Sequence, residues 1–315
     1  GVDSPIIAVG WQTTRERGKW VSTWDVADYA VGFHRDSVAP GQPGNTVLSG
    51  HNNTKGEVFR DLARLPVGDP ISVVPSFSLK DYGVYAEVAV VPAYAVVKRP
   101  KGLTAVESAA VWMAYITAYG ALIDIAKIGK GDAVIITAAS SSVGLAAIQI
   151  ANSVGAISIA TTRTSAKVSA LKAAGAAHVV VTEEQDLVTA INAITNGKGA
   201  RIVFDPIGGQ SVDKLAQATS PGGTLILYGG LSLEPTMFPV ASAFMKGLSL
   251  RGYVMFEIVG DKARREAAIA FITKGLEAGT LKPVIAKTFP FDSIVEAHRY
   301  LESNAQVGKI VVTVG

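Results

Sequence analysis

The sequence predicts an α/β fold with a doubly wound parallel sheet, and three observations support this prediction. Apolar strands alternate with helical stretches along the second half of the chain, which is typical of a parallel sheet covered by helices. One run, Gly131–Arg163, contains a complete strand, turn, helix and strand. Of the 315 residues, 49% are hydrophobic and 17% are charged, so the chain can bury a large core.

The run Gly131–Arg163 begins with an apolar strand and a turn made of small residues. Apolar residues at helical spacing follow, and Gly155 with Ala156 ends that helix before a second strand starts. The expected elements are a strand at 134–136, a turn at 138–142, a helix from 143 and a strand at 157–160. A unit of this kind is the one that binds a dinucleotide.

The alternation continues after this unit, and the further strands end in small or polar residues. The expected elements are strands at 177–182, 200–205, 223–229 and 248–256 and helices at 186–195 and 211–218. In open parallel sheets, ligands bind at the carboxyl ends of the strands. The strand ends at 138–144, 161–167, 205–209 and 228–231 are therefore expected to meet in one crevice.

The turn after the first strand is expected to bind a pyrophosphate. A helix N-terminus offers unpaired N–H groups and a partial positive charge, and small residues let phosphates approach. The turn departs from the G-x-G-x-x-G fingerprint because only Gly144 remains, but the hydroxyls of Ser140, Ser141 and Ser142 can donate to phosphate oxygens. An ordinary buried βαβ unit without a ligand is the alternative interpretation.

The end of the second strand favours NADPH over NADH. An NAD site usually carries an acidic residue about 20 residues after the glycines, but the stretch Thr161–Lys167 has no carboxylate. Arg163, Ser165 and Lys167 can instead hold a 2′-phosphate through charge-assisted hydrogen bonds. The alternative is that Arg163 and Lys167 are ordinary solvated loop charges.

The composition argues against several classes of protein. The net charge is +3 without a basic stripe, and no apolar run is long enough to span a bilayer, so we expect neither a nucleic-acid partner nor a membrane. No signal peptide is visible and the chain has no cysteine, so we expect a cytoplasmic protein. We expect no metal site because the four histidines (His34, His51, His178 and His298) lack metal-ligand spacing. His178 is expected at a strand entrance and His298 on the solvent face of a helix.

Several motifs occur in the order found in one protein superfamily. They are GVYAEVAVVP (83–92), AAVWMAYITAYGAL (109–122), AASSSVG (138–144), FDPIGG (204–209), GGTLILYGGL (222–231) and NAQVGKIVV (304–312). Through these motifs, residues from about 68 to 315 resemble the medium-chain dehydrogenase/reductase superfamily, in its zinc-independent, quinone-oxidoreductase-like branch.

The resemblance implies a Rossmann domain at 117–256, inserted into a β-rich, GroES-like barrel domain formed by residues 1–116 and 257–315. It implies NADPH in the crevice between the domains, with hydride transfer to a small quinone or an α,β-unsaturated carbonyl as substrate. It also suggests a homodimer formed through edge strands near residues 248–254.

The resemblance also assigns roles to individual residues. Ser141, Ser142, Val143 and Gly144 would meet the pyrophosphate, and Thr162, Arg163, Ser165 and Lys167 would surround the adenosine phosphate. Gly229, Gly230 and Leu231 would line the nicotinamide, Thr117 would lie under its ring, and Lys309 would close over the coenzyme. Ser140 and Asp205 are expected in the same crevice, and Tyr82 and Tyr115 are candidates on the substrate side.

The first 67 residues do not follow this superfamily. The stretch PGQPGNTVLSGHNN (40–53) resembles a sortase, with His51 at the position of the catalytic histidine. Sortase catalysis requires a cysteine nucleophile, so the absence of cysteine excludes that activity. An engineered chimera, a natural recombinant and a divergent N-terminus are the open explanations. A fourth is descent from the zinc-enzyme pattern G-H-E-x-x-G, in which Asn52 replaces the glutamate.

The atypical N-terminal part bears on function. In the superfamily, the N-terminal half-barrel forms much of the substrate pocket. The alternative to an NADPH-dependent reductase is therefore a scaffold or interaction protein that binds NADPH without turnover.

Overall fold

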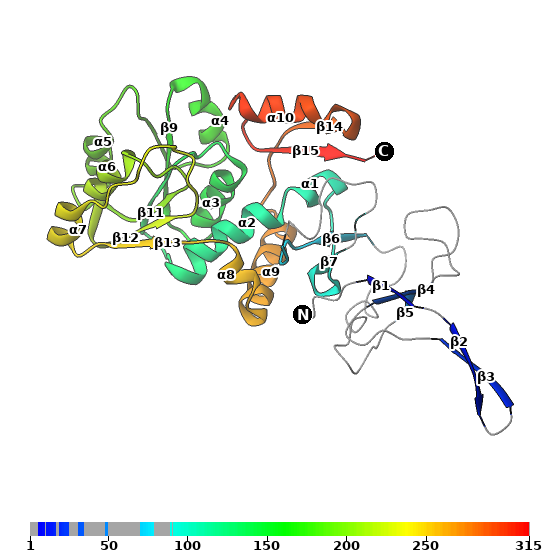
Figure 1. The fold of residues 1–315 in the computed structure, drawn as a ribbon. Coiled ribbons are helices and arrows are strands. Elements are labelled where there is room, and N and C mark those ends of the chain that lie inside the picture. The colour runs from blue at the N-terminus through cyan, green and yellow to red at the C-terminus, as the bar shows by residue number, and fades with distance from the viewer. Residues whose placement is uncertain are drawn as a thin grey trace. The chain divides into compact units, whose positions relative to one another are not determined.

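The computed structural model describes residues 70–78, 89 and 91–314, together with the backbone of strands between residues 6 and 49. The chain forms two compact units, Gly1–Arg99 and Pro100–Gly315 (Figure 1). The predicted residues Tyr82 and His51 lie outside the described residues. The predicted domain boundaries at 116 and 257 stay a prediction.

The described elements of the first unit are mainly strands. They are β1 (Ile6–Val9), β2 (Trp11–Glu16), β3 (Lys19–Trp24), β4 (Val31–His34), β5 (Leu48–Ser49), β6 (Ile71–Val73) and β7 (Val96–Lys98), with the 3-10 helix η2 (Ala93–Ala95). Strands β1, β4 and β5 form one sheet, while β2 pairs with β3 and β6 with β7 in antiparallel ladders. The GroES-like assignment of this part stays a prediction.

The second unit is built on a six-stranded parallel sheet. Its strands are β8 (Ala133–Ile136), β9 (Ile157–Thr162), β10 (His178–Val181), β11 (Ala200–Asp205), β12 (Thr219–Leu227) and β13 (Ser249–Gly252). The spatial order is β10-β9-β8-β11-β12-β13, so the chain reverses direction across the sheet between β8 and β11. This confirms the doubly wound α/β prediction, and a ligand crevice is expected at the reversal.

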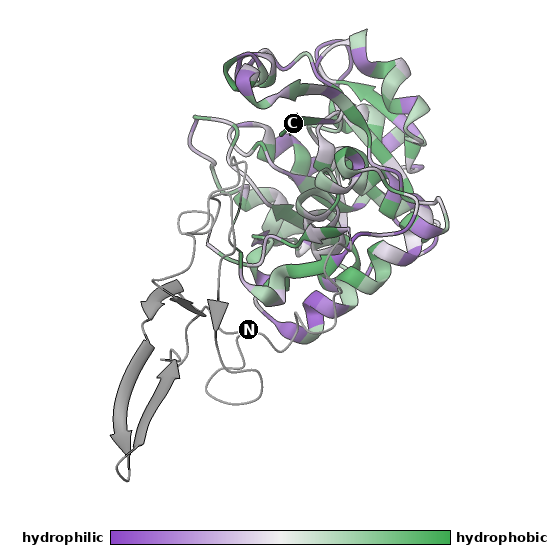
Figure 2. Cartoon of the chain, turned by 90° about the vertical axis from the view of Figure 1, so that its right-hand side faces the viewer, coloured by the Kyte–Doolittle hydropathy of each residue, from purple (hydrophilic) through white to green (hydrophobic). Residues whose placement is uncertain are grey.

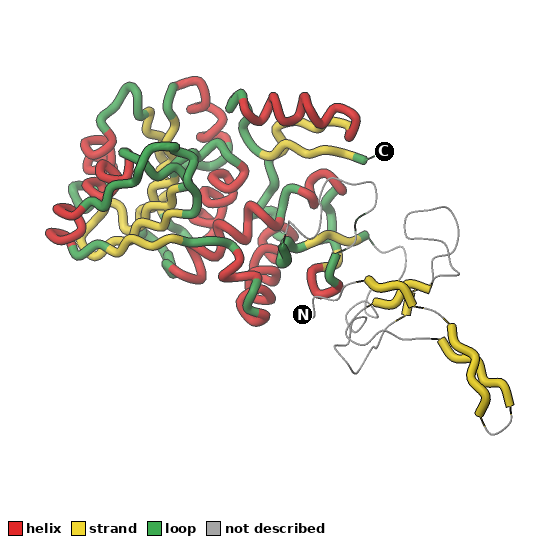
Figure 3. Tube along the Cα trace, in the orientation of Figure 1, coloured by secondary structure: helices red, strands yellow, loops and turns green. Residues whose placement is uncertain are grey.

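Helices cover both faces of this sheet (Figure 3). The flanking helices are α2 (Trp112–Tyr119), α3 (Ser142–Ser153), α4 (Val168–Ala173), α5 (Leu187–Ile194) and α6 (Ser211–Ala218). Ile135, Ile159 and Val203 are fully buried in a cluster with residues of α5 and α6. Val134 and Ile136 are also fully buried; because side chains alternate along a strand, they point to the opposite face.

The other elements of the second unit surround this core. They are α1 (Ala105–Ala109), the π-helix η3 (Gly120–Ile125), η4 (Ser165–Lys167), α7 (Val240–Lys246), α8 (Phe256–Val259), α9 (Lys262–Glu277), β14 (Ile285–Pro290), η5 (Phe291–Ser293), α10 (Ile294–Glu302) and β15 (Lys309–Thr313). Strands β14 and β15 form a separate parallel pair. In Figure 2 the strands of the central sheet carry mostly hydrophobic residues.

The structure confirms most of the expected elements and corrects two. The strand expected at 223–229 is β12, which begins earlier, at Thr219, and ends at Leu227. The strand expected at 200–205 and the helix expected at 211–218 are β11 and α6. His178 is exposed at the start of β10 and His298 is exposed on α10, as expected. The strand expected at 248–256 is wrong in its second half, because β13 ends at Gly252 and α8 begins at Phe256. Gly252 pairs with Leu227, the last residue of β12, so the neighbouring strand offers no partner beyond it.

Candidate functional site

The turn between β8 and α3 presents unpaired backbone donors. Ser141 caps the helix, because its Oγ accepts a hydrogen bond from the Gly144 N–H at 3.0 Å. The first N–H groups of a helix have no partner within the helix, and no described residue accepts a hydrogen bond from those of Ser142 and Val143, so a ligand can use them. Together with the partial positive charge of the helix start, these donors suit an anion such as a phosphate.

Gly144 lets the helix start close to the preceding turn. A Cβ at this position would lie 2.6 Å from both the Cα and the carbonyl oxygen of Ala139. These are backbone atoms and cannot move aside as a flexible side chain can. The one glycine left from the dinucleotide fingerprint therefore serves close packing, which is the role of the third glycine in that fingerprint.

Among the described residues, the oxygen atoms that accept hydrogen bonds from Lys167 are all neutral. Its Nζ donates to the Ser140 Oγ at 3.2 Å, to the Asn304 carbonyl at 2.7 Å and to the Gln306 carbonyl at 2.9 Å. Burial first, and then the nearby charge of Arg163, lower the pKa of Lys167. The lysine thus joins the turn between β8 and α3, here named the phosphate turn (138–142), to the C-terminal segment at 304–308. No described residue gives its charge an anionic partner.

The C-terminal segment also contacts the turn through its backbone. The Gly308 N–H donates to the Ser140 carbonyl at 2.9 Å, and Ser141 and Gly308 form a parallel bridge. Gly308 has a φ of 102°, and a Cβ there would lie 2.4 Å from the Val284 carbonyl oxygen. Glycine is therefore required at the point where this segment reaches the turn.

Three cations gather around the turn without carboxylate partners. Arg163 is exposed just after β9, Lys167 lies beside Ser140, and Lys309 follows the bridge residue Gly308. Burial lowers the pKa of Lys309. Within the described part of the chain, none of the three forms an ion pair. The positive charge of these three side chains suits the negatively charged phosphates of a dinucleotide.

Two buried polar atoms near the turn have no hydrogen-bond partner among the described residues. They are the hydroxyl of Tyr228 and the Oε1 of Gln306. Tyr228 directly follows β12, and its ring stacks on Phe204 at 3.9 Å between centroids, with the planes 17° apart. The sequence placed Tyr228 at a strand end of the expected crevice and Gln306 in the motif at 304–312, but it predicted no binding role for either residue. Unpaired polar atoms in this place fit a polar ligand.

Asp205 is held inside the protein. Its fully buried carboxylate accepts hydrogen bonds from the Thr137 hydroxyl and from the N–H groups of Ile207, at 3.2 Å, and Gly208, at 2.8 Å. These bonds fix the turn after β11. The expected coenzyme contact of Asp205 stays a prediction, which this bonding does not favour.

Tyr115 and Thr117 lie on α2, and both are buried. The Tyr115 hydroxyl donates to the Gln149 Oε1 at 2.8 Å, and the same oxygen accepts from the Lys282 N–H at 2.8 Å. Burial raises the pKa of Tyr115, so its hydroxyl is a poor acid. The substrate role of Tyr115 stays a prediction that this arrangement does not favour. The Thr117 hydroxyl donates to the Met113 carbonyl one helical turn earlier, at 2.6 Å.

The remaining predicted residues lie at strand ends of the same sheet edge. Thr162 ends β9, and its hydroxyl donates to the Thr164 carbonyl at 3.2 Å, while Ser165 starts η4 and is exposed. Gly229, Gly230 and Leu231 are exposed after β12. The Leu231 N–H donates to the Pro206 carbonyl at 2.9 Å, which folds this segment against the turn after β11. Their coenzyme contacts stay predictions.

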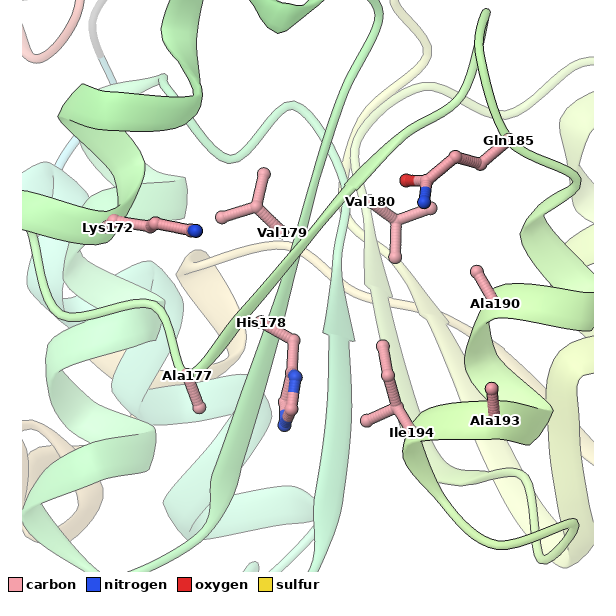
Figure 4. A pocket seen from close by; sticks show the side chains of 9 residues that line it. All are labelled: Lys172, Ala177, His178, Val179, Val180, Gln185, Ala190, Ala193 and Ile194. Atoms are coloured by element: carbon pink, nitrogen blue, oxygen red, sulfur yellow. The ribbon is translucent and has the colours of Figure 1, made fainter.

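A separate groove lies along the outer edge of β10 (Figure 4). It has a volume of about 360 Å³, and Lys172, His178, Gln185 and Ile194 are among its lining residues. None of the predicted coenzyme residues lines it. The groove is therefore a feature apart from the phosphate turn.

No group of three or more His, Asp or Glu side chains in the described part is arranged to hold a metal ion. No helix among the described residues has both the length and the apolar character needed to cross a bilayer.

Two family models match different parts of the chain. Residues 142–274 match the zinc-binding dehydrogenase family, and residues 1–117 match the sortase domain. The second match confirms the sortase resemblance of the N-terminal part and extends it beyond residue 67. The sortase-like region therefore precedes the dehydrogenase-like region within one chain.

Curated relatives belong to the dehydrogenase-like group. Human quinone oxidoreductase is 30% identical over 234 residues, which cover 73% of this chain and 69% of that protein. A 2-haloacrylate reductase from Burkholderia sp is 27% identical over 238 residues, covering 74% of this chain and 72% of the reductase. The human synaptic vesicle membrane protein VAT-1 homolog is 26% identical over 249 residues; the match covers 74% of this chain but only 63% of that protein.

Solved structures show the same relationship. An NAD-dependent alcohol dehydrogenase is similar with a TM-score of 0.67 and 34% identity, over 74% of this chain and 66% of that one. A mycobacterial protein in complex with NADPH is similar with a TM-score of 0.68 and 25% identity, over 73% of this chain and 72% of that one. The fold, the phosphate turn and these relatives lead to one conclusion: the chain belongs to the medium-chain dehydrogenase/reductase superfamily, in the group of the quinone oxidoreductases.

Proposed function

We propose that the chain is an NADPH-dependent oxidoreductase that passes hydride to a small quinone or an α,β-unsaturated carbonyl. The observation that carries this proposal is the set of three cations, Arg163, Lys167 and Lys309, beside the free N–H groups at the start of α3. Membership in the quinone oxidoreductase group supports the reaction class. The 2-haloacrylate reductase among the relatives supports an activated double bond as an alternative acceptor.

The chain's own groups would bind and orient the coenzyme. The N–H groups of Ser142 and Val143 suit the diphosphate, and Arg163 with Lys167 suits a terminal phosphate on the adenosine ribose. The nicotinamide supplies the hydride, and the protein supplies orientation and a dry site. The hydroxyl of Tyr115 is bonded to Gln149, so we assign no described residue as the proton donor.

NADPH is favoured over NADH by charge. The relatives include an NAD-dependent enzyme and a protein in complex with NADPH, so they do not select one coenzyme. At the end of β9, however, the chain carries Arg163 and Lys167 and no carboxylate that would bind the hydroxyls of an NAD ribose. A 2′-phosphate would compensate these positive charges.

A double substitution of Arg163 and Lys167 by alanine tests this assignment. Fluorescence titration of the wild-type chain should give tighter binding of NADPH than of NADH. The double variant should bind NADPH at least about tenfold more weakly, since each cation loses a bond to a charged group. Its affinity for NADH should fall less, because NADH loses only the support that Lys167 gives to the turn. Lys172→Ala, an exposed lysine in the β10 groove, is the control. Unchanged affinities in the double variant would refute the assignment.

A second candidate function is coenzyme binding without turnover. It is favoured by the sortase match over residues 1–117, where the superfamily has a part of its substrate pocket. Mixing the protein with NADPH and a quinone separates the two candidates. Loss of absorbance at the nicotinamide band supports the reductase, whereas binding without that loss supports the scaffold.

The partner best supported by the surface is a second copy of the chain. Strand β13 is an edge of the six-stranded sheet, and α7 directly precedes it. Large apolar side chains are exposed on and near α7, including Leu233 at 100%, Phe244 at 84% and Met245 at 78%. Such exposure on one region is typical of a protein interface.

A further inference from the structure

Tyr228 is held rigidly at the carboxyl end of the sheet. Its backbone N–H donates to the Asp205 carbonyl at 3.0 Å, which continues the pairing beyond the end of β12. Its ring lies almost parallel to that of Phe204, with centroids 3.9 Å apart. The stacked ring and the bonded backbone together fix where the hydroxyl points.

That hydroxyl lies buried beside the phosphate turn. It makes no well-aligned hydrogen bond with a described residue, and the Ser141 side chain is close enough to act weakly to lower the pKa of Tyr228. Burial first, and then the charge of Asp205, raise the pKa of Tyr228. The phenol therefore keeps its proton at physiological pH and can act as a hydrogen-bond donor.

The neighbouring hydroxyl of Ser141 can also donate a hydrogen bond. Its Oγ accepts from the Gly144 N–H at 3.0 Å, so its own proton is available for another acceptor. Two hydroxyl groups thus lie next to each other at the start of α3, and that of Tyr228 is buried without a well-aligned hydrogen bond to a described residue. A buried hydroxyl without a partner is unfavourable, and an anionic oxygen at the turn would remove that cost.

We propose that the Tyr228 hydroxyl donates a hydrogen bond, together with Ser141, to the phosphate anion bound at the start of α3. This inference rests on the proposed coenzyme function and adds a residue that determines coenzyme affinity. Tyr228 would act on the diphosphate, which NADPH and NADH share. Its effect is therefore separate from that of Arg163 and Lys167, which distinguish the two coenzymes.

The variant Tyr228→Phe removes the hydroxyl and keeps the ring that stacks on Phe204. Fluorescence titration should show that this variant binds NADPH and NADH about tenfold more weakly, a change equivalent to about 1.4 kcal/mol. Calorimetric titration with inorganic diphosphate probes the turn alone, and the variant should bind this anion more weakly by a similar factor. The matched control is Tyr119→Phe. The ring of Tyr119 contacts Phe271 on α9, so the loss of this hydroxyl should leave the affinities for NADPH, NADH and diphosphate unchanged.

Thermal unfolding without coenzyme gives a second readout. Because the hydroxyl makes no well-aligned hydrogen bond with a described residue, Tyr228→Phe should unfold at the wild-type temperature or above it, while NADPH should raise its unfolding temperature less than it does for the wild type. A marked loss of stability without coenzyme would show that the hydroxyl is structural and would overturn the inference.

The outcomes separate this inference from the proposed function. If the wild type binds NADPH and Tyr228→Phe binds it equally well, the inference fails and the proposed function stands. If the wild type binds diphosphate but neither coenzyme, and Tyr228→Phe weakens diphosphate binding, the inference about the anion stands and the proposed function fails. If the wild type binds none of the three probes, both fail.

Discussion

The ionisable side chains near the phosphate turn are of two kinds. The Asp205 carboxylate is buried and receives three hydrogen bonds from its own surroundings, so its charge is compensated by the fold. Lys309 is partly buried and, within the described chain, its ammonium group has neither an ion pair nor a hydrogen bond. A charged group without a compensating partner in the protein alone contributes most to the binding free energy of a ligand of opposite charge.

The substitution Lys309→Met tests this distinction. Burial lowers the pKa of Lys309 below 10.5, so the folded chain holds this proton less tightly than the unfolded chain. The wild-type free energy of unfolding should therefore rise with pH between the lowered pKa and 10.5, and this rise should be smaller in the variant. At neutral pH, without coenzyme, the variant should be more stable than the wild type, because a buried charge has been removed.

Coenzyme binding should change in the opposite direction. Lys309→Met should bind NADPH about tenfold more weakly, because a bond between charged groups is lost. Urea unfolding at several pH values and fluorescence titration measure the two effects, and Lys198→Met, at an exposed position, is the control. Lower stability at neutral pH together with unchanged affinity would contradict the expected role.

At the scale of elements, the packing of the β8–turn–α3 unit requires the start of α3 to approach the end of β8 closely. Ser141 caps the helix, and Gly144 packs against the backbone of Ala139. The C-terminal segment joins the same turn through Gly308 and Lys167. Anion binding at the turn and packing of the unit therefore depend on the same few atoms.

Gly144→Ala should damage both properties. Its Cβ would lie 2.6 Å from backbone atoms of Ala139, so the helix start must shift. We expect a loss of about 1–3 kcal/mol in the free energy of unfolding, as for overpacking elsewhere, and a large loss of NADPH affinity. The control is Gly129→Ala, where a Cβ would meet nothing within 4 Å and the stability should change by less than about 0.5 kcal/mol. Wild-type stability and affinity in Gly144→Ala would disprove this account.

Local patterns predicted the elements of the sheet better than the bonding of single side chains. The alternation of apolar strands with helical stretches predicted β11 and α6 at their observed bounds, because both elements are set by burial. The end of β13 depends on where its neighbour β12 stops, which is information from a distant segment. The roles of Asp205 and Tyr228 depend on partners such as Thr137 and Phe204, so the sequence placed them at strand ends without showing their bonds.

At the scale of the whole molecule, the described coenzyme residues all belong to one compact unit. Thr117, the turn at 140–144, the β9 end and Lys309 lie within Pro100–Gly315. The sortase match, in contrast, covers residues 1–117 and so falls mainly on the other unit. Coenzyme binding can therefore be tested independently of what the N-terminal part contributes to the substrate.

The exposed apolar side chains around α7 lead to a prediction about assembly. If a second copy covers this region, the wild-type chain should be a dimer in light-scattering measurements, and Phe244→Glu combined with Leu233→Glu should shift it toward the monomer. The two positions are 84% and 100% exposed, so the charges should not disturb the fold of the isolated chain. Val295→Glu, on α10 and 54% exposed, is the matched control and should remain dimeric. A monomeric wild-type chain, or a double variant that stays dimeric, would mean that the copies do not meet through this surface.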